Sequence, residues 1–197
     1  TQGGQSVISQ YEMHAVESLG LLKMDFLGLK NLTIIENARE QIKKTYGEEI
    51  DIDKIPLDDD KTLNLFREAN TTGVFQFESS GMKRYLKELR PTKFEDIVAM
   101  VALYRPGPIE LIPDFIDRKH GRTQISYLHP GLEPILKSTY GIAVYQEQVL
   151  QIARELAGFS YSQADVLRKA IGKKIKELLD EQKEKFVEGM MANGIQK

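Results

Sequence analysis

Two charged residues near the start of the chain have a spacing that could place them at a reactive site. Apolar side chains recur at alternate positions within residues 21–29, which predicts a strand leaving a buried sheet. Lys23 and Asp25 are two residues apart, so both project from the opposite face of that strand. A carboxylate beside an ammonium group suits a metal and phosphate site, since oxygen binds a hard cation and the amine offsets phosphate charge. The same spacing is typical of a solvated pair on an exposed strand, which is the commoner arrangement.

A second candidate site is the run of residues 167–174, which places cations around Gly172 between two predicted helices. The cations are Arg168, Lys169, Lys173 and Lys174, and no acidic residue interrupts them. Such a cluster beside the start of a helix could cradle a triphosphate or a nucleic-acid backbone, and the glycine would let a backbone approach closely. An ordinary solvated surface explains the cluster equally well.

Two further groups could contact nucleic acid. Arg118 and Lys119 follow an apolar helical face and could bind the DNA backbone, or they could form a solvated last turn that the helix dipole favours. Tyr145 and Gln148 follow an apolar run and could stack on a base or touch a sugar, although such a stretch is more often simply the start of a helix.

The elements expected to position these residues are mostly helices. Apolar residues recur with helical periodicity in several segments. Helices are predicted over residues 33–46, 109–116, 146–156 and 174–192, with a further helix that ends at Ala170. Strand patterns are few and lie near the N-terminal end. The predicted fold class is therefore mainly α with a small β contribution.

Capping residues predict where several of these helices begin and end. An aspartate run at residues 58–60 precedes one helix, and Ser79 or Ser80 could open the next. Capping-box spacing is present twice, in the pairs Thr92–Glu95 and Ser162–Asp165. Glycines at positions 47 and 158 follow helical patterns and are predicted to be C-terminal caps.

The composition excludes several classes of protein. Hydrophobic residues make up 41% and charged residues 28% of the 197 residues, a balance that fits a soluble globular protein and excludes a disordered chain. No apolar run is long enough to cross a bilayer, and the absence of cysteine excludes disulfides and fits a reducing cytoplasm. The net charge of -2 means that any contact with DNA must come from a local cluster. The first residue is Thr1, so we expect a piece of a longer protein.

Several longer motifs resemble, in the same order, those of the catalytic alpha subunit of bacterial DNA polymerase III, the C-family replicative polymerases. The resemblance extends from about Gln10 onward and is closest to the DnaE-type branch. It rests on the runs GLLKMDFLGL at residues 20–29, GVFQFES at 73–79, LYRPGP at 103–108, FIDRKHG at 115–121, TYGI at 139–142, YQEQ at 145–148 and ADVLR at 164–168.

This resemblance implies two domains and a role for each candidate residue. Residues 1–30 would be the C-terminal end of the polymerase palm and would supply the small β contribution, and residues 31–197 would be part of the helical fingers. Asp25 would be one of three aspartates that hold two Mg²⁺ ions. Lys169 stands where many members have a second arginine, so it keeps the charge but lacks the bidentate fork. Nucleotide contacts would come from Lys23, Arg168, Lys169, Lys173 and Arg105, and DNA contacts from Arg118, Lys119, Tyr145 and Gln148.

The activity implied is template-directed transfer of a nucleotide from a dNTP to a primer 3′-hydroxyl group, with Mg²⁺ as the cofactor. The partners would be primer–template DNA, the dNTP and, for the full-length protein, the sliding clamp and other replisome subunits, in the cytoplasm. The family's other two metal aspartates belong to a motif that this sequence lacks, so we expect the isolated chain to be inactive. The alternative is a non-catalytic helical module that binds nucleic acid, with Asp25 merely exposed.

Overall fold

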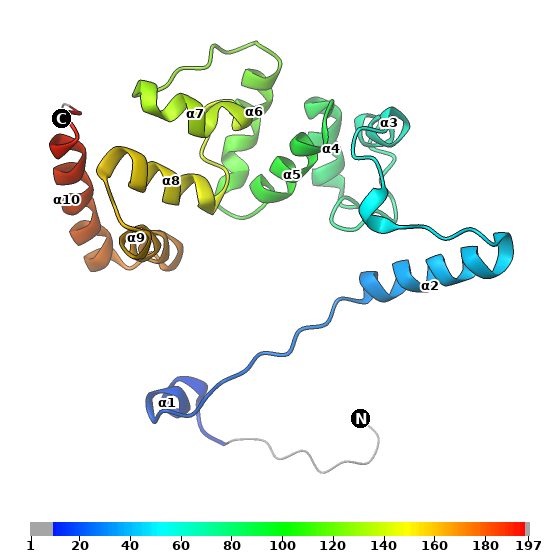
Figure 1. The fold of residues 1–197 in the computed structure, drawn as a ribbon, viewed down its shortest axis with the longest axis horizontal. Helices are drawn as coiled ribbons and strands as arrows, with labels where there is room; N and C mark the ends of the chain where they lie inside the picture. The colour runs from blue at the N-terminus through cyan, green and yellow to red at the C-terminus, as the bar shows by residue number, and fades with distance from the viewer. Residues whose placement is uncertain (1–9, 196–197) are drawn as a thin grey trace. The chain divides into compact units, whose positions relative to one another are not determined.

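The computed structural model describes residues 10–195, and this part of the chain is mainly helical with no strand (Figure 1). This confirms the predicted mainly α fold class. The α-helices are α1 (Met13–Ser18), α2 (Lys30–Tyr46), α3 (Asp60–Arg67), α4 (Ser80–Leu89), α5 (Phe94–Leu103), α6 (Ile112–Lys119), α7 (Glu133–Leu136), α8 (Gln146–Ala157), α9 (Tyr161–Lys173) and α10 (Lys176–Ala192). Short 3-10 helices are η1 (Ile52–Lys54), η2 (Pro108–Leu111), η3 (Pro130–Leu132) and η4 (Lys137–Thr139). None of the described helices is both long and apolar enough to span a lipid bilayer.

The chain divides into two units, Thr1–Lys54 and Ile55–Lys197. Within the first unit, none of residues 10–54 is buried. Helix α2 is 17 residues long and ends at Gly47, whose φ of 72° is the left-handed conformation predicted for a C-terminal cap. Its side chains Leu32, Ile34 and Ile35 are exposed, so α2 buries no apolar face within this unit.

The strand predicted for residues 21–29 is absent. This segment is irregular between α1 and α2, and side chains expected on its apolar face are exposed, Phe26 by 90%. An extended segment becomes a strand only when another segment accepts and donates its backbone hydrogen bonds, and residues 10–195 supply no such partner. The small β contribution is therefore not observed in the described chain.

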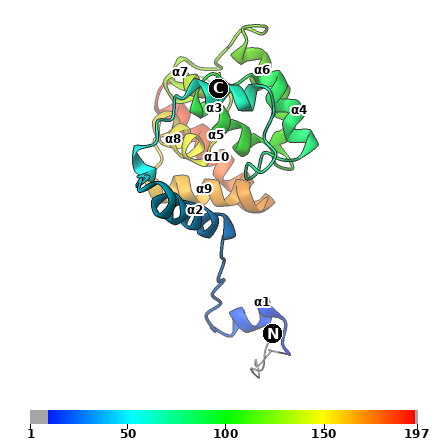
Figure 2. The ribbon, with the colours of Figure 1, turned by 90° about the vertical axis from the view of Figure 1, so that its right-hand side faces the viewer.

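The second unit is built around one large apolar core and two smaller ones. The large core joins α3 to α6 and the chain around Ile142, with Met82, Leu86, Met100 and Phe115 almost fully buried. Helix α9 packs against α8 and α10, which also contact each other (Figures 1 and 2). The buried residues of this second core are Phe159 and three alanines, Ala153, Ala157 and Ala164. The basic residues of α9 are thus carried by a helix that two neighbours hold in place.

Serine and aspartate caps begin several helices of this unit. Asp59 accepts a hydrogen bond from Thr62 N at 2.8 Å, and Ser79 accepts one from Met82 N at 3.2 Å, so both predicted caps are confirmed. Gly158 ends α8 with φ 67°, also as predicted. These interactions connect residues close in sequence, which is why the sequence alone reveals them.

Both predicted capping boxes are wrong. Before α5, the carboxylate that accepts from Thr92 N at 2.9 Å belongs to Asp96 rather than to Glu95. Before α9, Ser160 and Gln163 form the box, two residues earlier than predicted. Before α9, Ser160 and Ser162 are both capping residues, and the earlier one lies at the cap. Before α5, the N-cap is Lys93, whose side chain makes no cap hydrogen bond.

Candidate nucleotide-binding site

Lys23 and Asp25 lie in contact, although the strand expected to place them on one face is absent. The Nζ atom of Lys23 lies 3.2 Å from Oδ2 of Asp25, and the side chains are 42% and 68% exposed. The Asp25 carboxylate is therefore accessible to a ligand from solvent. Residues 10–195 contain no group of three His, Asp or Glu side chains that could hold a metal ion. The described residues therefore do not by themselves form a metal site with three protein ligands.

The basic run of α9 is organised by an acidic residue that precedes it. Oδ1 of Asp165 lies 2.9 Å from Nε and 2.8 Å from Nη2 of Arg168, and Oδ2 lies 2.8 Å from Nζ of Lys169. These residues are three and four positions apart, so the helix brings them to one face. Hydrogen bonds from Lys169 and then Arg168 hold the pKa of Asp165 below its ordinary value. The carboxylate therefore stays ionised and fixes both cations.

Helix α8 supplies a second contact to the same arginine. Nη1 of Arg168 donates to Oε1 of Gln146, the first residue of α8, at 3.3 Å. The side chains of Arg168 and Lys169 remain 31% and 56% exposed. Arginine has five donors and lysine three, so both keep donor capacity for an anion from solvent. We call Arg168, Lys169 and Lys173 the α9 cation face.

Lys173 and Gly172 lie inside α9, not in a link between two helices. The predicted end of the helix at Ala170 is wrong, because α9 continues to Lys173 and Lys174 follows in the left-handed conformation with φ 53°. Lys173 is exposed and its ammonium group has no partner within residues 10–195. A side chain at Gly172 would meet no atom of the described chain, so an outside group could approach the backbone there.

Lys119 has a structural position that its sequence context did not predict. Its side chain is 6% exposed and its Nζ atom lies 3.4 Å from Oδ2 of Asp96, which is 1% exposed. The same ammonium group lies 3.4 Å from the Arg90 carbonyl oxygen and 3.4 Å from the Thr92 hydroxyl group. A lysine has three donors, and all three have oxygen partners here. This geometry favours a role in joining α6 to α5 over a contact with DNA.

Tyr140 completes the group around Asp96. Its hydroxyl group donates to Oδ1 of Asp96 at 3.2 Å, and its ring packs edge-on against Phe115. Burial and the nearby Asp96 carboxylate raise the pKa of Tyr140 well above its ordinary value. Both carboxylate oxygens of Asp96 thus have partners within the fold.

Gln148 is also committed to the fold. It is 6% exposed, and its Oε1 atom accepts from Val144 N at 2.8 Å and Tyr145 N at 3.0 Å. Its amide nitrogen donates to the Ile135 carbonyl oxygen at 3.1 Å and to the Thr139 hydroxyl group at 2.8 Å. This amide therefore has no free donor for DNA, and it joins the chain before α8 to α7 and η4.

The other predicted contacts differ in accessibility. Arg105 is exposed beside a pocket of about 370 Å³ that Gln76 and Tyr104 also line, and its guanidinium group has no partner within residues 10–195. Arg118 is partly buried and donates to the Tyr140 carbonyl oxygen at 3.3 Å. Tyr145 is partly buried, and burial raises its pKa, with Glu95 and Asp96 adding to the shift. Of these three residues, Arg105 is the most available to a ligand.

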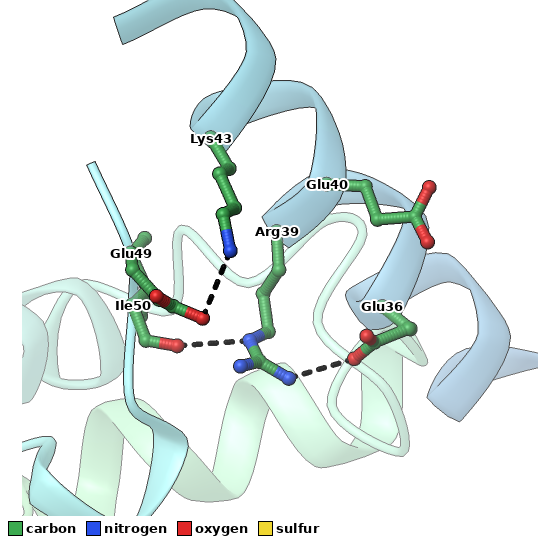
Figure 3. A pocket seen from close by; sticks show the side chains of 6 residues that line it. All are labelled: Glu36, Arg39, Glu40, Lys43, Glu49 and Ile50. Atoms are coloured by element: carbon green, nitrogen blue, oxygen red, sulfur yellow. Dashed lines mark hydrogen bonds and ion pairs between the residues drawn. The ribbon is translucent and has the colours of Figure 1, made fainter. Parts of the chain in front are cut away.

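The first unit also holds a charged pocket, of about 320 Å³, between α2 and the chain that follows it (Figure 3). Arg39 donates to the Ile50 carbonyl oxygen at 2.9 Å and to Glu36 at 2.7 Å, and Lys43 donates to Glu49 at 3.2 Å. Both basic side chains therefore have acidic partners already. These contacts join α2 to the segment that follows it.

Asp165 and Asp96 are the residues that sequence reasoning missed. The sequence does indicate a role for Asp165, because it precedes Arg168 by three residues and Lys169 by four. The sequence indicates a role for Asp96 only weakly, by placing an acidic residue within the apolar segment that forms α5. Its partners Lys119 and Tyr140 are too distant in sequence for spacing to reveal them.

Comparison with known proteins identifies the family. Residues 31–194 match the bacterial DNA polymerase III alpha subunit finger domain. DNA polymerase III subunit alpha of Staphylococcus aureus (strain COL) is 51% identical over 194 residues, which are 98% of this chain and 18% of that protein. The protein of the same name from Halalkalibacterium halodurans is 53% identical over 191 residues, 97% of this chain and 17% of that protein. The chain spans less than a fifth of the length of these relatives. It belongs to the bacterial DNA polymerase III alpha subunit finger domain family.

Proposed function

We propose that this chain acts within a replicative DNA-directed DNA polymerase, where its helices receive the incoming dNTP during template-directed synthesis. The family match and the relatives named DNA polymerase III subunit alpha support this proposal. Residues 1–30 would be the end of the palm and residues 31–197 part of the fingers. In the intact polymerase, residues 21–29 would pair with other strands of the palm, which would account for the small β contribution.

The observation that carries the proposal is the α9 cation face. Lys169 and Lys173 are exposed and Arg168 is partly exposed along one helix, and Asp165 fixes Arg168 and Lys169. A triphosphate needs cations that are already oriented, because they then neutralise charge at no further cost of reorganisation. Arg105, which has a free guanidinium group, is a further candidate for nucleotide contact.

The reaction would be attack of the primer 3′-hydroxyl group on the α-phosphate of the dNTP, with pyrophosphate as the leaving group. The α9 cation face would bind the triphosphate and offset the charge that accumulates on the leaving phosphates. Lys23 would add a cation beside Asp25. Two Mg²⁺ ions are the expected cofactors, with Asp25 as one ligand and the remaining ligands from outside residues 10–195.

Contacts with primer–template DNA would come from exposed or partly exposed groups. Arg118 and Tyr145 are the candidates that keep some accessible surface. Lys119 and Gln148 are weaker candidates, because their donors already have partners inside the fold. The intact protein would act in the bacterial cytoplasm, with the sliding clamp and other replisome subunits as partners.

The test is Asp25→Asn in the full-length polymerase. We expect primer extension to fall by at least about a hundredfold, the scale for removing one charge-stabilising group from a reaction centre. Asp51→Asn is the matched control, because Asp51 is another exposed carboxylate that pairs with a lysine, at 3.0 Å from Lys54. Near-normal synthesis by the Asp25 variant would reject the assignment.

The isolated chain provides a second test. We expect no primer extension from it when it is purified free of host polymerase, since it offers a single candidate metal carboxylate. Measurable extension would contradict this expectation.

A further inference from the structure

Asp165 occupies a position that the proposed function does not explain. A carboxylate beside a phosphate-binding cluster repels the ligand by Coulomb's law. Yet this one lies within 2.8 Å of both Arg168 and Lys169 and is 40% exposed. A residue that only neutralises charge needs no particular geometry. The geometry of the Asp165 contacts therefore indicates whether it has a further role.

Each carboxylate oxygen of Asp165 contacts a different cation. Oδ1 receives Nε and Nη2 of Arg168, and Oδ2 receives Nζ of Lys169. The arginine is held from its other side by Gln146 of α8. Two contacts on opposite edges fix the plane of a guanidinium group, whereas one contact leaves it free to rotate. Asp165 and Gln146 together therefore orient Arg168, whose side chain remains 31% exposed.

We infer that Asp165 is a positioning residue, which holds Arg168 and Lys169 in the orientation that receives the phosphates of the incoming nucleotide. This inference rests on the proposed function. Side chains of this length lose considerable rotamer freedom when they bind a ligand. A carboxylate that restricts them beforehand reduces that loss, and the gain exceeds the repulsion that its charge adds.

Asp165→Asn distinguishes positioning from simple charge neutralisation, because the two roles predict opposite results. Asparagine has nearly the same shape, but in the same rotamer its oxygen faces only one of the two cations, and the amide nitrogen that faces the other cannot accept a hydrogen bond. If Asp165 only neutralises charge, the substitution strengthens nucleotide binding. If it positions the cations, the KM for the dNTP rises, by about three- to tenfold.

The experiment is steady-state primer extension by the full-length polymerase, with the dNTP titrated for Asp165→Asn, Arg168→Ala and the double variant. We expect both single variants to raise the KM for the dNTP. The double variant should raise it by less than the product of the two single effects, because Asp165 acts through Arg168. Asp165→Glu keeps the charge but displaces the carboxylate, and its KM should lie between those of the wild type and of Asp165→Asn.

The outcomes separate this inference from the proposed function. If Arg168→Ala raises the KM while Asp165→Asn leaves it unchanged or lowers it, the positioning role is wrong and the nucleotide-binding role stands. If Arg168→Ala itself leaves the KM unchanged, the proposed site is wrong and the inference fails with it. Multiplicative single effects would also contradict a role that acts through Arg168.

A matched control excludes a general effect on folding. Glu181 and Lys185 form an exposed ion pair of 2.6 Å on α10, four residues apart as Asp165 and Lys169 are. Glu181→Gln therefore removes a similar pair from another helix. Both variants should melt close to the wild type, since exposed pairs contribute little to stability. Only Asp165→Asn should change the KM, and an equal change in both variants would overturn the inference.

Discussion

Two carboxylate–lysine pairs in the second unit have similar chemistry and opposite surroundings. Asp96 and Lys119 are 1% and 6% exposed and 3.4 Å apart, whereas Asp165 and Lys169 are 40% and 56% exposed and 2.8 Å apart. The buried pair has partners for every donor of its lysine. The exposed pair keeps donors for a ligand. Burial and the number of satisfied donors, rather than residue type, separate a structural cation from a candidate for binding.

The largest difference between the two pairs should appear in stability. Asp96→Ala leaves the Lys119 ammonium group buried without its carboxylate and removes the partner of the Tyr140 hydroxyl group. Breaking a buried pair in this way costs about 3–5 kcal/mol. We expect urea unfolding of the chain, followed by circular dichroism, to show a loss of this size. Asp165→Ala is the control and should move the midpoint little, so equal losses would contradict the comparison.

A smaller contrast is expected between two glycines of the same helical cluster. A side chain added at Gly189 of α10 would collide with the carbonyl oxygen of Ala157 at the end of α8, whereas one at Gly172 of α9 would meet nothing. We expect Gly189→Ala to destabilise the chain by about 1–3 kcal/mol. Gly172→Ala should stabilise it by about 0.5–1 kcal/mol, because alanine has a higher helix propensity than glycine.

The Gly172 variant also tests the proposed contact of α9 with the nucleotide. If nucleotide phosphates approach the backbone of α9 there, Gly172→Ala should raise the KM for the dNTP in the full-length polymerase even though it stabilises the chain. Thermal melting and dNTP titration of this variant therefore measure separate properties. A destabilised Gly172→Ala chain would show that the helix is packed differently from the structure described above.

The smallest expected effect concerns alkaline pH. Tyr140 has a raised pKa in the folded chain, so its stabilising contribution is complete below the ordinary pKa of 10.0 and decreases as the pH rises above it. Unfolding midpoints measured between pH 8 and pH 11, roughly spanning that ordinary value, should fall in the upper part of this range. Tyr140→Phe should reduce the fall without abolishing it, because the pKa of Tyr145 is raised as well. An unchanged pH dependence in Tyr140→Phe would contradict the assignment.

The sequence revealed those features that depend on nearby residues. Helical periodicity located α2, α8 and α10, and the caps Asp59, Ser79 and Gly158 were correctly predicted, since each acts within about one turn. The predicted strand failed for a physical reason, because pairing needs a partner that residues 10–195 do not contain. The capping box predicted before α9 failed because Ser160, two residues earlier than Ser162, is also a capping residue. The one predicted before α5 failed because the N-cap there is Lys93.

The roles of the basic residues were harder to predict, because they depend on tertiary contacts. Lys119 and Arg118 are adjacent in sequence, yet only the structure shows that Lys119 faces Asp96, on another helix. Gln148 is likewise satisfied by groups more than two helical turns away in sequence, at Ile135. Arg168 and Lys169, in contrast, are organised by Asp165 of their own helix, so their spacing of three and four residues indicates the contact.

The most direct test is a structure of the full-length polymerase with primer–template DNA and an unreactive dNTP analogue. The quantity to measure is the distance from the guanidinium nitrogens of Arg168 to the triphosphate oxygens. We predict hydrogen-bond distances of about 2.7–3.2 Å, with Asp165 still in contact with the arginine. A triphosphate bound away from α9, with Arg168 facing solvent in the complex, would contradict the proposed site.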